Sequence, residues 1–211
     1  MNDMNIVLMG CPGAGKGTQS AKLKETLGLK HISTGDVLRA EMAAGTQIGK
    51  QVAARINQGS LVPDELMIAM LENIVASTDQ GIILDGFPRT VAQAEALDEM
   101  FKRLSRRLDA VVMIDLPEEE VIKRLARRRL CRKCGKPAAS TTTNVCECGG
   151  ELYVRADDAP ESVKHRLEVY RRQTLPVKEY YQNSGKYVEI NGNQTPDQVF
   201  KDICNVLEKV K

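Results

Sequence analysis

Tryptophan is absent from this 211-residue chain, and aromatic residues of all kinds make up only 4% of it. Proteins that bind single-stranded nucleic acid stack bases on aromatic side chains, and DNA-binding domains carry a large positive charge. Here 30 Lys and Arg residues stand against 28 Asp and Glu residues, a formal net charge of +2. Both features argue against nucleic acid as a partner.

Long apolar runs are also missing. No stretch approaches the roughly 18 uninterrupted apolar residues of a membrane-spanning helix, and the short apolar run near the N-terminus follows Asp3 without a basic region before it. We therefore expect a soluble cytoplasmic protein with no membrane partner. With 42% hydrophobic residues, a chain of this length can build one large core that carries small insertions.

Glycine is concentrated where the first strand should end. An apolar run, Asn5 to Met9, leads into Gly10-Cys11-Pro12-Gly13-Ala14-Gly15-Lys16-Gly17-Thr18. Glycines let successive backbone N–H groups point inward, the start of the next helix adds positive potential, and the lysine supplies a point charge. The spacing predicts a phosphate-binding loop. Gly17 stands where this motif has Ser or Thr, so ligation of Mg²⁺ by the hydroxyl of Thr18 is left open.

Strand and helix patterns alternate after this loop. Apolar periodicity and capping signals predict strands over residues 5–9, 30–32, 81–85, 109–115 and 186–190, and helices over 16–27, 66–75, 90–104, 118–129, 161–181 and 196–210. A small helical insertion begins with a side-chain cap at Ser33 and extends to Gly59. Apolar strands separated by helices predict an α/β fold, a parallel five-stranded sheet with helices on both faces.

No acidic residue occurs between Glu120 and Glu147, where Lys and Arg accumulate. Taken singly, Arg127, Arg129 and Arg132 are typical of a solvated helix face. Arg124 and Arg128 are four residues apart, so a continuous helix would place both on one face. There they could grip one phosphate chain or stack on a base.

The apolar strand that ends at Asp85 is followed by Gly86-Phe87-Pro88-Arg89-Thr90. Glycine allows close approach of a ligand to the backbone, and Arg89 at the start of the next helix is suited to hold a second anion beside the phosphate loop. Asp85 could bind Mg²⁺ through water molecules or cap the adjacent loop. Thr90 and Gln93 also form a capping box, so Gln93 could serve a helix end or a ligand.

Four of the six cysteines, Cys131, Cys134, Cys146 and Cys148, are clustered, whereas Cys11 and Cys204 stand alone. The clustered segment is too short to build its own apolar core, and a tetrahedral thiolate site would fold it. We expect a structural Zn²⁺ on these four sulfurs rather than free thiols or a disulfide. Iron or cobalt stays open, as does replacement of one sulfur of the C-x-C pair by another ligand.

Together these motifs resemble the adenylate kinases of bacterial type with a metal-binding lid, over essentially the whole chain. Beyond the phosphate loop, the resemblance is carried by Ser33-Thr34-Gly35-Asp36-Val37-Leu38-Arg39, Asp85 to Thr90, Arg124-x-x-x-Arg128, Arg155-Ala156-Asp157-Asp158 and Arg166. It implies a P-loop NTPase-like core over residues 1–32, 63–126 and 159–211. It also implies two mobile flaps, a nucleoside-monophosphate-binding (NMP-binding) insertion over residues 33–62 and a zinc-ribbon-like lid over 127–158.

The resemblance also assigns roles to single residues. At the ATP phosphates these are Gly13, Ala14, Gly15, Lys16, Gly17, Thr18 and Arg128. At the ATP base they are Arg124 and Gln194. Gln194 stands where relatives carry a lysine, and it would contact the base through its backbone. For AMP they are Thr34, Arg39, Ser60, Leu61, Val62, Gly86, Phe87, Pro88, Arg89, Gln93, Arg155 and Arg166. The catalytic residues would be Lys16, Arg89, Arg128, Arg155 and Arg166, with Asp85 close to Mg²⁺.

The implied reaction is reversible in-line phosphoryl transfer from MgATP to AMP, giving two ADP, by a monomer whose partners are these nucleotides. Such transfer requires mainly positioning and charge stabilisation, so no nucleophilic side chain is needed, and His31 and His165 are expected to be structural.

A regulatory GTPase is set aside because N-K-x-D and D-x-x-G motifs are absent. A sibling kinase for UMP, CMP or another monophosphate is the main alternative, although the resemblance associates Thr34 and Thr90 with AMP. A zinc-ribbon nucleic-acid-binding ATPase is a remote one.

Overall fold

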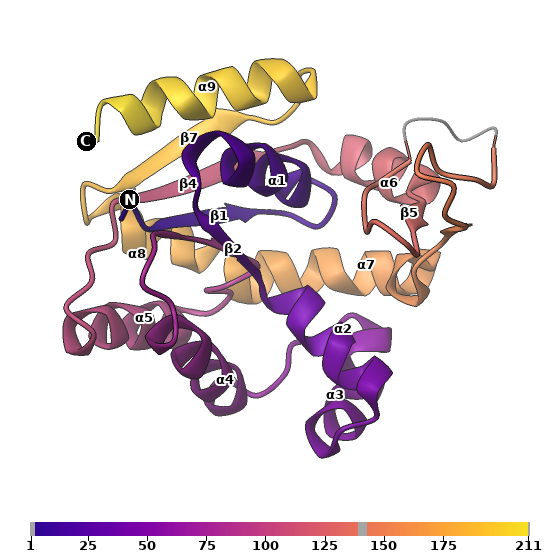
Figure 1. Ribbon diagram of the computed structural model, residues 1–211, viewed down its shortest axis with the longest axis horizontal. Helices are drawn as coiled ribbons and strands as arrows, with labels where there is room; N and C mark the ends of the chain where they lie inside the picture. Colours follow the sequence, from indigo (N-terminus) through magenta and orange to yellow (C-terminus); the bar gives the residue numbers. More distant parts are fainter. Residues whose placement is uncertain (1–2, 139–142, 211) are drawn as a thin grey trace.

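The computed structural model describes residues 3–138 and 143–210. Its centre is a five-stranded sheet in which every neighbouring pair of strands is parallel. The order across the sheet is β2 (Lys30–Ser33), β3 (Ile82–Asp85), β1 (Ile6–Gly10), β4 (Ala110–Asp115) and β7 (Tyr187–Asn191) (Figure 1). The predicted parallel five-stranded sheet is confirmed.

Helices cover both faces of this sheet. They are α1 (Lys16–Leu27), α4 (Asp64–Ala76), α5 (Val91–Arg103), α6 (Glu118–Arg127), α7 (Pro160–Val169), α8 (Pro176–Gln182) and α9 (Pro196–Glu208). In Figure 1, α1 and α9 lie on one side of the sheet, and α4, α5 and α8 lie on the other. Along β1, Val7 and Met9 belong to the core shared with α4, α5 and α8, whereas Ile6 and Leu8 pack with α1 and α9. A strand buried on both faces explains why its sequence is apolar without alternation.

Two helices, α2 (Thr34–Ala44) and α3 (Gln47–Gln58), project from one end of the sheet (Figure 1). The helical insertion expected after Ser33 is present, and Ser33 caps it as predicted, because its side chain accepts a hydrogen bond from Asp36 N. The insertion breaks at Gly45, whose φ of 65° ends α2. Gly49 lets the two helices pack closely, since a Cβ there would lie 2.2 Å from Glu41 O.

The helix predicted over residues 161–181 is interrupted. A π-helical turn, η2 (Tyr170–Thr174), separates α7 from α8. Pro176 lacks an N–H group and cannot continue the helical hydrogen-bond ladder, and just before it Leu175 N donates to Tyr170 O at 2.8 Å, a five-residue step. The interruption lets α7 pack in the core shared with α1 and α9 while α8 packs in the opposite one.

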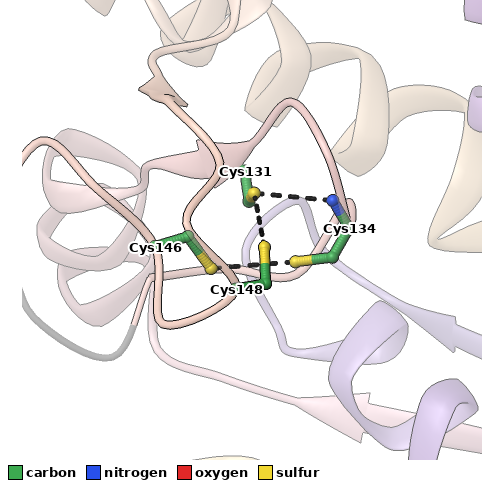
Figure 2. Close-up of side chains that lie close together, drawn as sticks. All are labelled: Cys131, Cys134, Cys146 and Cys148. Atoms are coloured by element: carbon green, nitrogen blue, oxygen red, sulfur yellow. Dashed lines mark hydrogen bonds between the residues drawn. The ribbon is translucent and has the colours of Figure 1, made fainter.

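The small segment that begins after α6 forms its own sheet. Strands β5 (Leu130–Cys131) and β6 (Leu152–Tyr153) pair antiparallel, and the segment ends in the short helix η1 (Ala156–Asp158). The four clustered cysteines lie together within it (Figure 2). Among the residues that the structure describes, no helix has the length and apolar character that crossing a membrane requires.

Candidate functional site

The glycine-rich loop connects the end of β1 to the start of α1. Gly10, Gly13 and Gly15 all have positive φ angles, 146°, 82° and 97°. A Cβ on Gly10 would also lie 2.6 Å from Ile114 O on the neighbouring strand, so only glycine fits there. Gly15 caps α1 without a side-chain hydrogen bond, which leaves N–H groups of the first turn available to an anion.

Lys16 is the first residue of α1, and its side chain folds back over the loop. Its Nζ donates to Gly10 O at 2.8 Å and to Cys11 O at 3.0 Å. Burial lowers the pKa of Lys16 to about 8, an effect opposed by Asp85 and reinforced by the nearby guanidinium groups of Arg89 and Arg166. The loop therefore holds a cation whose charge a phosphate group would stabilise.

Asp85 lies at the end of β3, next to β1. Its Oδ2 is 3.4 Å from His31 Nε2, and a Cβ on Gly17 would be 3.8 Å from the same oxygen. The carboxylate is therefore beside the first turn of α1, where phosphates would bind. A carboxylate oxygen in that position fits Mg²⁺, a hard cation that prefers oxygen ligands and keeps several waters.

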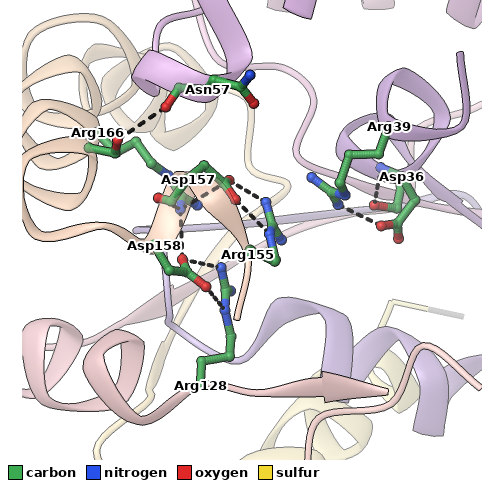
Figure 3. A network of polar contacts seen from close by, with 10 residues as sticks. Asp36, Arg39, Asn57, Arg128, Arg155, Asp157, Asp158 and Arg166 are labelled. Carbon is green, nitrogen blue, oxygen red and sulfur yellow. Dashed lines mark hydrogen bonds and ion pairs between the residues drawn. The ribbon is translucent and has the colours of Figure 1, made fainter. Parts of the chain in front are cut away.

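Beside this loop, five arginines and three aspartates form a polar group, of which Figure 3 labels all but Arg89. The arginines are Arg39, Arg89, Arg128, Arg155 and Arg166, and the aspartates are Asp36, Asp157 and Asp158. Five guanidinium groups against three carboxylates leave an excess of two positive charges. Such an excess in a partly buried place favours binding of an anion.

The aspartates hold most of these guanidinium groups in fixed positions. Asp158, whose side chain is fully buried, accepts from Arg128 Nε at 2.7 Å and Arg128 Nη2 at 2.5 Å, and Arg166 Nη1 lies 3.2 Å from it. Asp157 accepts two hydrogen bonds from Arg155. Burial lowers the pKa of Arg166 to about 10, and it also lowers the pKa of Arg89.

Most of the residues predicted to bind AMP line one pocket between the helical insertion and α7. Its walls are Thr34, Gly35, Leu38, Arg39, Ile56, Gly59, Ser60, Leu61, Val62, Met67, Gly86, Arg89, Gln93, Arg155, Asp157 and Arg166. Phe87 and Pro88 are not among them; both residues are buried, Phe87 in the core. Thr34 Oγ1 donates to Gly86 O at 3.0 Å, so the lone pairs of this hydroxyl are left for a donor in the pocket.

Gln93 serves the start of α5, as one of the two alternatives from the sequence expected, whereas its contact with a ligand stays a prediction. Its backbone N–H donates to Thr90 Oγ1 at 3.1 Å, as in a capping box, although its Oε1 accepts from Arg89 N at 2.7 Å instead of from Thr90 N. Its side chain also lines the pocket. The Nε2 group donates to Asp64 Oδ1 at 2.7 Å.

Arg124 and Arg128 do not share a helix face, which corrects the expectation from their spacing. Helix α6 ends at Arg127, and Arg128 has an extended backbone with ψ of 124°. Arg124 Nη2 donates to Gly192 O at 2.9 Å, in the loop after β7, while Arg128 binds Asp158. Gln194 lies in that same loop and donates to Asn191 O and Asp202 Oδ2.

The sulfurs of Cys131, Cys134, Cys146 and Cys148 lie within 4.8 Å of one another. The Cys131–Cys148 and Cys134–Cys146 sulfur distances are 3.5 and 3.7 Å, close to the about 3.8 Å expected for two thiolates on tetrahedral zinc. Backbone N–H groups of Cys134 and Lys133 point at Cys131 Sγ and lower the pKa of that thiol to about 6. All four cysteines have free thiols, so the cluster could bind zinc.

Several residues of this site escape sequence reasoning. The pairing of Asp157 and Asp158 with arginines depends on contacts across the fold, although their place directly after Arg155 is a signal that charges meet there. Asp64 contacts residues 26 and 29 positions away, and the sequence shows only an acidic residue at a helix start. The contact between His31 and Asp85 follows from the pairing of β2 with β3.

A parallel sheet whose first strand leads through a glycine-rich loop into a helix, with an arginine-lined pocket alongside, defines a phosphate-loop nucleotide-binding protein. A family model described as Adenylate kinase matches residues 8–186. The chain belongs to the adenylate kinase family.

Curated relatives agree over nearly the full length. The chain is 46% identical over 216 residues to Adenylate kinase of Archaeoglobus fulgidus, covering 99% of this chain and 100% of the relative. It is 45% identical over 214 residues to Adenylate kinase of Thermodesulfovibrio yellowstonii, with 98% and 100% covered. Identity to Adenylate kinase of Desulfitobacterium hafniense is 47% over 216 residues, with 97% and 98% covered.

Proposed function

We propose that this protein is an adenylate kinase that transfers the terminal phosphoryl group of MgATP to AMP, reversibly, to give two ADP. The observation that carries the proposal is the adjacency of two anion sites. Asp85 lies beside Gly17 in the first turn of α1, and the residues that follow it in the chain, Gly86 and Arg89, line the neighbouring pocket. Two phosphate-bearing ligands, one in each site, would therefore meet end to end among fixed cations.

On the ATP side, the loop over Gly13 to Thr18 would surround the phosphates with backbone N–H groups, and Lys16 would exchange its two carbonyl partners for phosphate oxygens. Arg124 and the loop that contains Gln194 would face the base, and Arg128 the phosphates. Mg²⁺ bound with ATP would neutralise charge on the outer phosphates, with Asp85 holding its waters.

On the AMP side, Arg39, Arg89, Arg155 and Arg166 would hold the phosphate, and Thr34, Gln93 and residues 60–62 would surround the base. The hydroxyl of Thr34 donates its proton to Gly86 O, which leaves its lone pairs for a donor on the ligand. The adenine amino group is a donor, so this polarity supports AMP. The O4 acceptor of uracil would have to compete with Gly86 O for the proton of Thr34, which weighs against a UMP kinase.

The chemistry requires little beyond this arrangement. The AMP phosphate would attack the terminal phosphorus of ATP in line, without a phosphoenzyme, while Lys16, Arg89, Arg128, Arg155 and Arg166 stabilise the charge on the transferred group. A single chain supplies both nucleotide sites, so a monomer is sufficient for activity.

We propose that residues 33–62 and 127–158 act as flaps that close over the two nucleotides and exclude water. Contacts that support this role join the end of α3 to α7, where Ser162 Oγ donates to Asn57 O at 3.1 Å and Ser60 Oγ is 3.0 Å from His165 Nε2. In the second flap, Cys131, Cys134, Cys146 and Cys148 would hold a structural Zn²⁺, since four thiolates leave no open position for catalysis.

The test is an ADP-formation assay with MgATP and AMP, UMP, CMP, GMP or dAMP in turn. We expect AMP to have the highest kcat/KM, with no labelled phosphoprotein formed from γ-labelled ATP. A preference for UMP or CMP would replace the specificity assignment by a sibling kinase, and failure to phosphorylate any monophosphate would overturn the proposal.

A further inference from the structure

The side-chain amide of Gln93 is held between two groups of opposite hydrogen-bonding character. Its Oε1 accepts from Arg89 N and its Nε2 donates to Asp64 Oδ1, both at 2.7 Å. A backbone N–H group can only donate and a carboxylate can only accept. Because Gln93 is only 3% exposed, water cannot easily take the place of either partner. The amide therefore has one favourable orientation.

Both carboxylate oxygens of Asp64 accept hydrogen bonds from the first turn of α5 and the residue before it. While Oδ1 accepts from Gln93, Oδ2 accepts from Thr90 Oγ1 at 2.8 Å, and Thr90 Oγ1 in turn accepts from Gln93 N. One carboxylate at the start of α4 thus fixes both the start of α5 and the side chain that α5 presents to the pocket. The three residues form a closed hydrogen-bonded unit.

A primary amide has two N–H donors and two acceptor lone pairs, and each end of Gln93 has used one. One donor and one acceptor remain, in a fixed order. Adenine presents a donor, its 6-amino group, beside the N1 acceptor, whereas hypoxanthine and guanine present an acceptor, O6, beside the N1–H donor. Turning the amide over would exchange the two preferences, but it would place Oε1 against the carboxylate of Asp64 and Nε2 against Arg89 N–H.

We propose that Asp64 is a specificity-determining positioning residue, which selects 6-aminopurine over 6-oxopurine monophosphates by fixing the orientation of the Gln93 amide. The proposal rests on the proposed function, in which this pocket binds the base of AMP. Asp64 acts through Gln93, and no contact between Asp64 and the nucleotide is required.

Asp64 also has a structural role at the start of α4, which must be distinguished from its proposed effect on base specificity. An acidic residue in the first turn of a helix is stabilising wherever it points, and Glu65 occupies the same turn of α4 with an exposed side chain. Glu65→Gln is therefore a matched control, because it removes the same kind of charge without touching Gln93. Asp64→Asn nearly preserves the shape, but its amide can either accept from or donate to Gln93.

The experiment measures kcat/KM for AMP and for IMP, the hypoxanthine nucleotide, with saturating MgATP. We expect Asp64→Asn to lower the AMP/IMP ratio at least about tenfold, partly by raising turnover of IMP, with the KM for ATP within about twofold of the unaltered protein. Glu65→Gln should leave the ratio unchanged. An equal loss for both substrates in Asp64→Asn would overturn the proposal, because it would indicate a purely structural role.

A second measurement needs no variant and applies if Asp64→Asn fails to fold. The unaltered protein is assayed with AMP, with IMP and with purine riboside monophosphate, which lacks a 6-substituent. A locked amide repels O6, so we expect the order AMP, then the unsubstituted purine, then IMP. Turnover of IMP equal to or above that of the unsubstituted purine would refute the lock. Failure of the proposed function is distinguishable, since the unaltered protein would then form no ADP from ATP and AMP.

Discussion

Burial makes the positive charge of Lys16 energetically unfavourable, and a charge kept in such a place indicates a function. Its ammonium group is satisfied by the carbonyls of Gly10 and Cys11, yet burial still lowers its pKa. A side chain that served only to cap the loop would not need a charge in this place. A bound anion would compensate for the desolvation of this buried ammonium group, which is the property that a phosphate site needs.

Replacing this charge should remove activity without unfolding the protein. We expect Lys16→Met to lower kcat about 100-fold or more, the usual effect of losing one preorganised charge at a transition state. Lys24→Met on the exposed face of the same helix is the control and should be near normal. Steady-state kinetics with circular dichroism of both variants decides, and undiminished turnover in Lys16→Met would contradict the role assigned to the loop.

The lowered pKa of Lys16 also predicts a pH dependence. Below about pH 8 the ammonium form binds phosphate, and above it the neutral form predominates. We therefore expect kcat/KM for ATP, which reports the free enzyme, to fall as the pH rises through about 8. Lys16→Arg, although less active, should show a flat profile to about pH 9, because its guanidinium stays protonated and the pKa of Arg166 is about 10. A flat profile for the unaltered protein would count against the assignment.

At the scale of elements, the two ends of the segment around the cysteines are tied by a buried ion pair. Arg128 follows α6, Asp158 closes η1, and the carboxylate is fully buried. Removing one partner of a buried pair leaves the other charge unpaired. By contrast, the pair between Arg132 and Glu151 in the same segment is exposed on both sides and should contribute little.

This contrast can be measured by denaturant unfolding. We expect Asp158→Asn to lower the free energy of unfolding by about 2–4 kcal/mol, whereas Glu151→Gln should change it by less than about 1 kcal/mol. Equal effects of the two substitutions would show that burial of Asp158 does not determine its contribution.

The cysteine cluster provides a second test at this scale. Cys131→Ser should abolish stoichiometric zinc binding and lower Tm by roughly 5–10 °C, the shift expected for a loss of about 2–3 kcal/mol in a chain of this size. Some phosphoryl transfer at low temperature should remain, because no reacting group is removed. Metal analysis and calorimetry make the measurement, with Cys204→Ser on α9 as the control. Full metal content in Cys131→Ser would contradict four-sulfur ligation.

At the scale of the whole molecule, the parallel sheet decides where chemistry occurs. The carboxyl ends of its strands lie along one edge, which brings Gly10 at the end of β1 close to Asp85 at the end of β3. Ligands of open α/β sheets bind in the crevice at this edge. The two segments that we propose to act as flaps come after strands that end at this edge, because α2 follows β2 directly and the cysteine-bearing segment follows α6, which itself follows β4.

Closure of the molecule should respond to occupation of both sites at once. A bisubstrate analogue with two adenosines joined by five phosphates, present at about 1,000 times its Kd, should stabilise the protein by about 4 kcal/mol and raise Tm by roughly 10 °C. At the same concentration, ATP alone fills one site and should do clearly less. Equal shifts in a thermal unfolding assay would mean that the two sites do not act together.

How far the sequence predicts this site depends on the distance between interacting residues. The phosphate loop, the cap at Ser33 and the cysteine cluster involve neighbours in the chain, so local sequence patterns predict each of them. Periodicity did not predict the helix end at Arg127 or the π turn before Pro176, where tertiary packing and a missing N–H group override it. The partners of Asp64 and Asp158 were not predictable, because charge pairing between distant segments leaves no local pattern.

By itself, the sequence determined the ligand class and the layered fold, because backbone geometry at glycines, apolar strands and thiolate spacing are local properties. Only the tertiary structure decided which side chains meet. It paired the arginines with Asp157 and Asp158, separated Arg124 from Arg128, and placed Asp64 against Gln93. The physical reason is that hydrogen bonds and desolvation act over a few ångströms in space, whatever the separation of the residues along the chain.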